Sequence, residues 1–145
     1  MTSRWITRKG AKVDRVACPW LIRKYVDPAA EFYFVPKDRV LAEAAKLGAT
    51  PFDAEGVDLG HHGNDCSFET IIKRRGLTDP ALLELAKIVH GADVKDPQAV
   101  PQAAGLLAIA EGMAATIPDD HEKLAKGFPI YDALYAWCQA RVAAG

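Results

Sequence analysis

Two histidines and a cysteine lie close together in one short segment, Gly60-His61-His62-Gly63-Asn64-Asp65-Cys66. The chain has only four histidines and three cysteines in all, so this segment concentrates the side chains that transition metals and redox chemistry favour. Glycine-rich connections between a strand and a helix commonly carry functional residues. We therefore predict that His61 and His62 bind a metal ion. The alternative is a polar loop that holds no ligand.

Cys18 and Cys66 are both predicted to lie near helix N-termini. Pro19 suits the first turn of a helix, which places Cys18 at or beside the N-cap, and Cys66 comes just before a helical pattern. The helix dipole and the free amides there lower the pKa of a thiol. Cys66 and Cys18 are therefore the predicted catalytic residues, as a redox pair or as parts of a metal site. The alternative is that each is a small buried apolar side chain.

Arg15 and Arg23 lie on either side of the Cys18-Pro19-Trp20 step. A guanidinium beside a helix N-terminus is well suited to an oxyanion. Arg15 and Arg23 are therefore predicted to bind a negatively charged substrate. The alternative is a surface salt bridge from Asp14, which could also cap the helix.

A second polar cluster is Asp119-Asp120-His121-Glu122. Asp119 and Glu122 fit a capping box, which leaves Asp120 and His121 without a structural explanation. An imidazole and a carboxylate would complete a metal site with His61 and His62 if the two segments meet in the fold. The predicted metal ligands are therefore His61, His62, His121 and Asp120. His90, in the last turn of a predicted helix, is interpreted as a favourable helix-end cation.

Hydrophobic periodicity and turn residues predict an α+β domain. Strands are predicted over residues 5–7, 31–35, 50–52 and 57–59, and helices over residues 14–25, 38–47, 80–90, 98–116 and 130–142. Two further helices are predicted, one capped by Asp65 or Ser67 and ending at Gly76, the other starting at Asp119 and broken by Gly127 and Pro129. Gly91 should lie past a helix end, and Gly105 and Gly112 should allow close helix approach. The result is one domain over residues 1–145, predominantly helical, with a small β-sheet in the N-terminal half and a helical C-terminal half.

Bulk composition argues against several classes of protein. The formal net charge of −1 lacks the basic excess typical of nucleic-acid binding, so no nucleic-acid partner is expected. No apolar run reaches the length of a membrane span, and residues 1–10 lack the apolar core of a signal peptide. We therefore expect no membrane association, a cytoplasmic location and reduced cysteines.

Distinctive motifs cover nearly the whole chain. They are Val13-Asp14-Arg15-Val16-Ala17-Cys18-Pro19-Trp20-Leu21-Ile22-Arg23, Glu31-Phe32-Tyr33-Phe34-Val35-Pro36, Pro51-Phe52-Asp53, His61-His62-Gly63, Cys66-Ser67-Phe68, Gly91-Ala92-Asp93, and residues 101–106, 118–121 and 131–138. Together they resemble the chromate-resistance domain at the C-terminus of bacterial ChrB-type proteins. The resemblance implies a role in resisting or sensing chromate, a tetrahedral dianion shaped like sulfate. Longer members with an additional N-terminal part are regarded as regulators. This chain begins almost at the first motif, so a DNA-binding role is not expected.

The leading hypothesis is a metal-binding domain with a His, Cys and carboxylate site that acts in chromate reduction or the associated oxidative stress. The metal would be a divalent transition metal: iron, manganese or zinc. Whether the domain is a metal-dependent oxidoreductase is left open. The rival hypothesis is a non-catalytic sensor of chromate or sulfate that acts through a partner chain, and the third is a purely structural or interaction domain. Chromate or a similar oxyanion is the predicted small-molecule partner, and a homodimer is left open.

Overall fold

The computed structural model describes residues 3–145 as a small parallel sheet with helices on both of its faces. The strands are β1 (Arg4–Arg8), β2 (Glu31–Val35) and β3 (Thr50–Pro51), in the spatial order β2-β1-β3. The helices are α1 (Asp14–Leu21), α2 (Val40–Leu47), α3 (Ser67–Arg75), α4 (Pro80–Asp93), α5 (Pro101–Thr116) and α6 (Asp120–Ala144), with a π-helical turn Ile22–Val26 and a 3-10 turn Lys37–Arg39. The predicted α+β class, with its sheet in the N-terminal half, is confirmed.

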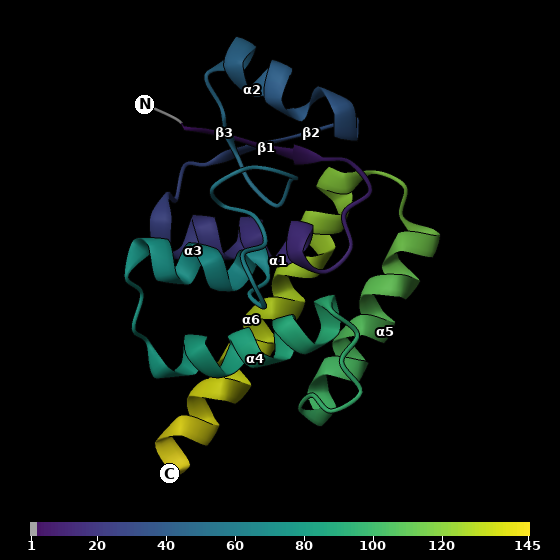
Figure 1. Ribbon diagram of the computed structural model, residues 1–145. Helices are drawn as coiled ribbons and strands as arrows, with labels where there is room; N and C mark the ends of the chain where they lie inside the picture. The colour runs from purple at the N-terminus through teal and green to yellow at the C-terminus, as the bar shows by residue number, and fades with distance from the viewer. Residues whose placement is uncertain (1–2) are drawn as a thin grey trace.

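The two faces of the sheet pack against different helices. Alternate residues of a strand point to opposite faces, and Ile6 of β1 packs with Val40 and Ala44 of α2. Trp5 belongs instead to the larger core, together with Phe32 of β2 and residues of the other five helices. Figure 1 shows α2 alone on one side of the sheet and α1, α3 and α6 on the other. The loops that follow the strands can therefore contribute residues to either face of the sheet.

Both internal prolines were predicted at helix boundaries, and both predictions are wrong. Pro19 lies inside α1, so Cys18 is in mid-helix and Val13 is the N-cap. Pro129 lies inside the continuous 25-residue helix α6, so the predicted break there is absent. A helix-internal proline removes one hydrogen bond. In α1, seven of the eight residues are buried, and we attribute the continuation of the helix to this packing.

Glycines allow close helix approach at positions other than those predicted. A Cβ at Gly91 would lie 2.4 Å from the Ala99 Cβ, and one at Gly127 would lie 2.7 Å from Val16 Cγ1. Gly91 also lies within α4, not past its end as predicted. Gly105 and Gly112, the predicted positions, have no atoms of neighbouring segments within 4 Å of such a Cβ.

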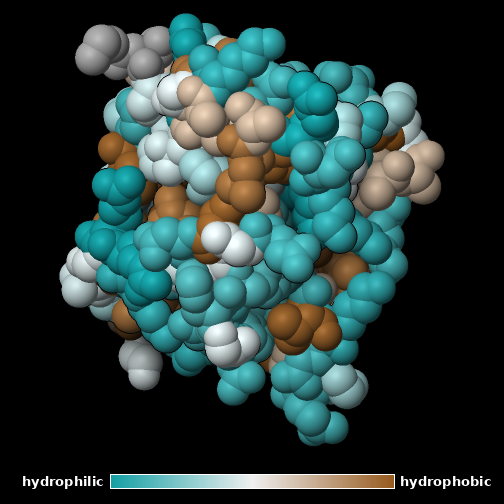
Figure 2. All heavy atoms as spheres, turned by 45° about the horizontal axis from the view of Figure 1, so that its top comes forward, coloured by the Kyte–Doolittle hydropathy of each residue, from teal (hydrophilic) through white to brown (hydrophobic). Residues whose placement is uncertain are grey.

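Two smaller predictions also differ from the structure. Residues 57–59 form no strand; only Leu59 makes an isolated bridge, to Phe52. The N-cap of α3 is Cys66, not Asp65 or Ser67, so Cys66 does lie at a helix start. Over residues 3–145, every helix is too short or too polar to cross a membrane. The face in Figure 2 is largely hydrophilic, with small separate hydrophobic patches.

Candidate metal centre

Three aspartates and a histidine meet at the carboxyl end of the parallel sheet. Asp14 begins α1, which follows β1, and Asp53 follows β3. Asp93 is the last residue of α4, and His61 lies in the loop before α3. Loops after the carboxyl ends of parallel strands are the usual position of ligand sites in such sheets.

His61 Nε2 is the point on which the carboxylates converge. It lies 3.6 Å from Asp14 Oδ2, 3.4 Å from Asp53 Oδ1 and 3.4 Å from Asp93 Oδ2. The side chain of His61 is 51% exposed, whereas those of Asp14 and Asp53 are 1% and 3% exposed. The Asp93 side chain is 18% exposed, so the cluster consists of two buried carboxylates, a partly buried third and a half-exposed imidazole.

The start of α3 fixes the position of Asp14. Its carboxylate accepts hydrogen bonds from the Ser67 amide at 2.7 Å and from the Phe68 amide at 3.3 Å. These amides belong to the first turn of α3, where backbone donors have no partner within the helix. The dipole of α3 also favours a negative charge there. Asp14 is thus held rigidly with one edge facing His61.

Asp53 is fixed by a hydroxyl and a guanidinium. Ser67 Oγ donates to Asp53 Oδ1 at 2.7 Å, and Arg15 Nη1 lies 3.2 Å from Asp53 Oδ2. Arg15 also donates to the Gly10 carbonyl at 2.8 Å. Arg15 is therefore the cation that partly balances the cluster.

Without a bound ion, the carboxylates of the cluster repel one another. Burial, followed by the charges of Asp93 and Asp53, raises the pKa of Asp14 well above its ordinary value, against the lowering effect of the two α3 amides. The pKa of Asp93 is also raised, first by burial and then by Asp53, while His61 and Arg15 oppose the rise. Like charges in one site disfavour simultaneous ionisation. A bound cation would relieve this repulsion.

One atom each from Asp14, His61 and Asp93 lies within 4.8 Å of the others, which suits a shared metal ion. Carboxylate oxygens favour manganese, and an imidazole nitrogen adds affinity for iron and zinc. The donor set therefore fits the three metals predicted from the sequence. It keeps His61 of the predicted ligands and contains Asp14 and Asp93 in place of the others.

A second group of metal-ligand types lies beside the first and consists of Cys66, Glu69 and His90. Glu69 Oε1 accepts from the Cys66 amide at 3.1 Å and lies 2.5 Å from His90 Nδ1. His90 is in the last turn of α4, as predicted, and pairs with Glu69 there. The carboxylate thus both caps α3 and contacts the imidazole.

The two predicted catalytic cysteines are buried thiols. Burial, followed by the charge of Asp14, raises the pKa of both Cys18 and Cys66. The position of Cys66 at the N-cap of α3 does not reverse this effect, and Cys18 is not at a helix start. The geometry therefore does not favour thiolate chemistry, and a catalytic role stays a prediction.

The other predicted ligands lie apart from the convergence on His61. His62 is exposed, and its Nε2 contacts the Asp58 carbonyl at 2.6 Å. Asp120 accepts hydrogen bonds from the Gly10 and Ala11 amides at 2.9 and 2.8 Å. The His121 ring packs edge-on against Phe34. Among residues 3–145, the recorded groups of metal-ligand types include none of these three side chains.

Arg23 is held by a backbone carbonyl and by two aromatic rings. Its Nε and Nη2 donate to the Ala30 carbonyl at 3.2 and 3.1 Å, and its guanidinium lies over the rings of Phe32 and Phe128. With Arg15 held by Asp53 and Gly10, both predicted oxyanion-binding arginines already have acceptors.

The sequence patterns did not single out these carboxylates as candidate ligands. Asp14 was considered as a cap or salt-bridge partner, whereas Asp53 and Asp93 appeared only within motifs. A usable signal was present: Asp14 and Asp53 each follow a strand that the sequence predicts. The carboxyl ends of neighbouring parallel strands share one edge, but the parallel arrangement itself was not predicted.

Comparison with known proteins identifies relatives of this chain. The family described as "ChrB, C-terminal domain" matches residues 5–138. Protein ChrB of Cupriavidus metallidurans is 36% identical over 133 residues, which cover 91% of this chain and 40% of that protein. The chain thus spans about two fifths of the length of this curated relative. No solved structure matches.

Proposed function

Because the chain belongs to the ChrB C-terminal domain family of chromate-resistance proteins, we propose that it contributes to that resistance by binding a divalent transition metal. His61, Asp14 and Asp93 are the proposed ligands, and Asp53 lies beside them. The convergence of three carboxylates on His61 Nε2 within 3.6 Å carries this proposal. Among residues 3–145, Arg15 is the only arginine or lysine that forms an ion pair with these carboxylates.

The residues around the site have separate roles in this proposal. The α3 amides and Ser67 orient Asp14 and Asp53 before a metal arrives, which limits the entropy lost on binding. Their orienting contacts are comparable to the second-shell hydrogen bonds of known metal sites. His61, being half exposed, is the ligand that an incoming ion meets first. Bound there, iron or manganese would supply redox chemistry for chromate or for the oxidants formed beside it.

The rival hypothesis, an oxyanion sensor that works through Arg15 and Arg23, has less support. Arg15 is paired with Asp53, and Arg23 is paired with the Ala30 carbonyl. An anion at either guanidinium would have to displace an existing acceptor. An anion at Arg15 would also lie close to the carboxylate cluster, which repels it.

The direct test is titration of the purified, chelator-treated full chain with Mn²⁺, Fe²⁺ and Zn²⁺ by calorimetry. We expect saturable binding of at least one metal ion. His61→Ala and Asp93→Asn should each weaken it by at least about 100-fold, since loss of outer-shell partners alone costs 10–100-fold. His62→Ala and His121→Ala are matched controls that should bind as the wild type does.

A further variant separates the two groups of metal-ligand types. If His90→Ala abolishes binding while His61→Ala leaves it intact, the metal binds beside Cys66 and the proposed ligand set is wrong. Failure of all three ions to bind would reject the proposal altogether. In cells, a chromate-sensitive strain complemented with this chain should lose its resistance with His61→Ala and keep it with His62→Ala.

A further inference from the structure

A cavity of about 510 Å³ lies on the α2 side of the sheet, at the carboxyl ends of the strands. Arg8, the last residue of β1, and Lys37, two residues after β2, contribute cations to its lining. Ala54 and Glu55, which follow β3, line it as well. All three parallel strands therefore deliver residues to one cavity, in the position where parallel sheets usually bind ligands.

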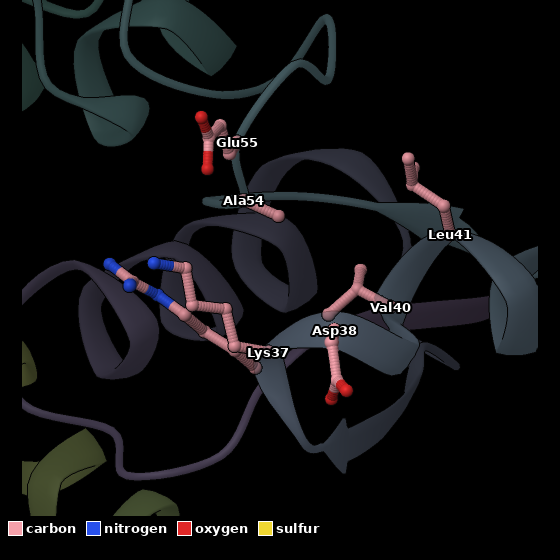
Figure 3. Close-up of a pocket in the computed structure, with 7 residues that line it drawn as sticks. Lys37, Asp38, Val40, Leu41, Ala54 and Glu55 are labelled. Atoms are coloured by element: carbon pink, nitrogen blue, oxygen red, sulfur yellow. The ribbon is translucent and has the colours of Figure 1, made fainter.

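The strand register brings the two cations together. Arg8 pairs with Val35 in the parallel ladder, and the Lys9 amide donates to the Val35 carbonyl at 2.8 Å. This pairing leaves only Pro36 between the end of β2 and Lys37. Figure 3 shows the Lys37 side chain running along the cavity, while the Asp38 carboxylate points in another direction.

Within residues 3–145, neither cation forms an ion pair with a carboxylate. Arg8 Nε is shielded from solvent and lacks a hydrogen-bond partner. Buried donors without acceptors are rare in folded proteins, and each calls for an explanation. A guanidinium and an ammonium side by side also repel each other unless an anion lies between them. Arg15 Nε is likewise shielded and without a partner, but the Nη atoms of Arg15 donate to Asp53 and Gly10, and Arg23 donates to Ala30. Arg8 and Lys37 differ from them in lining an open cavity without an ion-pair partner within residues 3–145.

From these observations we infer that Arg8 and Lys37 bind a tetrahedral oxyanion of the chromate, sulfate or phosphate type. Guanidinium groups recognise such oxygens in a bidentate manner, and lysine supplies a point charge. The cavity has room for the ion together with several waters, each occupying about 30 Å³. Glu55 also lines the cavity and weakens the attraction for an anion.

The loop that follows β3 contributes residues to both the oxyanion site and the metal centre. The two sites lie on opposite faces of the sheet edge. Thr7 Oγ1 donates to the Asp53 carbonyl at 3.3 Å, and the next residue, Arg8, faces the cavity. Asp53 thus belongs to the metal centre, whereas Ala54 and Glu55 line the oxyanion site. The inference extends the proposed function by giving its oxyanion a location, and rests on it only for the choice of chromate as a ligand.

The experiment is equilibrium dialysis of the full chain against chromate, sulfate and phosphate, each after chelator treatment and again with Mn²⁺ present. We expect saturable binding without metal. Lys37→Gln should weaken it about 10-fold or more, the size expected for a charge-assisted hydrogen bond. Lys46→Gln, a change at another exposed lysine, on α2 outside the cavity, is the matched control, and Glu55→Gln should tighten binding. Arg8→Gln should act like Lys37→Gln, with circular dichroism confirming the fold.

The outcomes separate the two proposals. Binding that needs no metal and falls with Lys37→Gln supports the oxyanion site even if no metal binds anywhere. Binding that requires Mn²⁺, is lost in His61→Ala and is unchanged in Lys37→Gln would overturn the oxyanion site and leave the metal centre intact. No saturable binding of any of the three anions would also overturn it. The relative affinities then identify which anion the site prefers.

Discussion

Asp14 and Asp120 are both buried aspartates at the first position of a helix, yet their surroundings differ in charge. Each accepts hydrogen bonds from two backbone amides, Asp14 from the start of α3 and Asp120 from Gly10 and Ala11. Asp120 is also paired with Lys123, a buried lysine of the same helix, at 3.2 Å. Asp14 is accompanied instead by two further carboxylates.

The pKa values of the two aspartates move in opposite directions as a result. Burial raises the pKa of Asp120, but the Ala11 and Gly10 amides and Lys123 outweigh it, so the net pKa is lowered. For Asp14, burial and the neighbouring carboxylates outweigh the α3 amides, and the pKa is raised. The negative charge of Asp120 is thus balanced by groups of the chain itself. The arrangement of carboxylates at Asp14 instead favours binding of an external cation. Active sites are commonly destabilising in this way.

The largest effect is expected at the balanced site. Asp120→Asn leaves Lys123 buried without its partner and turns an amide towards two backbone donors. Breaking one side of a buried ion pair costs about 3–5 kcal/mol, so the free energy of unfolding in urea should fall by that amount. Metal affinity should be unchanged if the variant folds.

Glu122→Gln, at the same end of α6, provides the control. Glu122 is half exposed and its contact with Lys126 spans 3.9 Å, so the change should cost less than about 1 kcal/mol. Equal losses for Asp120→Asn and Glu122→Gln would show that Lys123 and Asp120 are not coupled, and the contrast with Asp14 would fail.

Local sequence signals were sufficient for most of the fold. The aromatic and β-branched run of β2 and the glycine after α2 predicted element type and ends correctly, because both depend on neighbouring residues. Pro19 misled the prediction, because burial of α1 against distant segments outweighs the local cost of a helix-internal proline. Pro129 also misled it, since α6 continues through this exposed proline. Gly91 and Gly127 were misread for a similar reason, since only tertiary contacts reveal a close approach.

The candidate site was predictable only in part. His61 was singled out because histidine is rare in this chain, and rarity is visible in a sequence. The aspartates were missed because aspartate is common and its role depends on where strand ends meet. His121 and Asp120 were predicted to bind a metal because no structural role was visible for them in the sequence. The structure gives them contacts with Phe34 and with the Gly10 and Ala11 amides.

A smaller effect of the opposite sign is expected at Asp93. In the metal-free protein at pH 7, Asp93→Asn removes a like charge beside Asp14 and should stabilise the fold by about 1 kcal/mol, or about 2–4 °C in Tm for a chain of this size. If Mn²⁺ binds at the proposed site, it should stabilise the wild type and should not stabilise this variant. Differential scanning calorimetry with and without chelator measures both. A Tm lower than that of the wild type in chelator would contradict the repulsion inferred here.

The smallest differences are expected in acid. There the unfolding free energy of Asp120→Asn should rise towards that of the wild type, and that of Asp93→Asn should fall towards it. Asp120 has a lowered folded-state pKa, so its stabilisation is present above the ordinary aspartate value of about 3.9 and is lost as pH falls through the folded-state pKa. Asp14 and Asp93 have raised pKa values, so their stabilisation is present below about 3.9 and is lost as pH rises. In chelator, the cost of Asp120→Asn and the gain from Asp93→Asn should therefore both shrink on acidification. Urea unfolding from pH 7 down to about pH 2 measures these differences, because the loss at Asp120 lies below about pH 3.9. A gain from Asp93→Asn that persists unchanged in acid would mean that charge repulsion is not its cause.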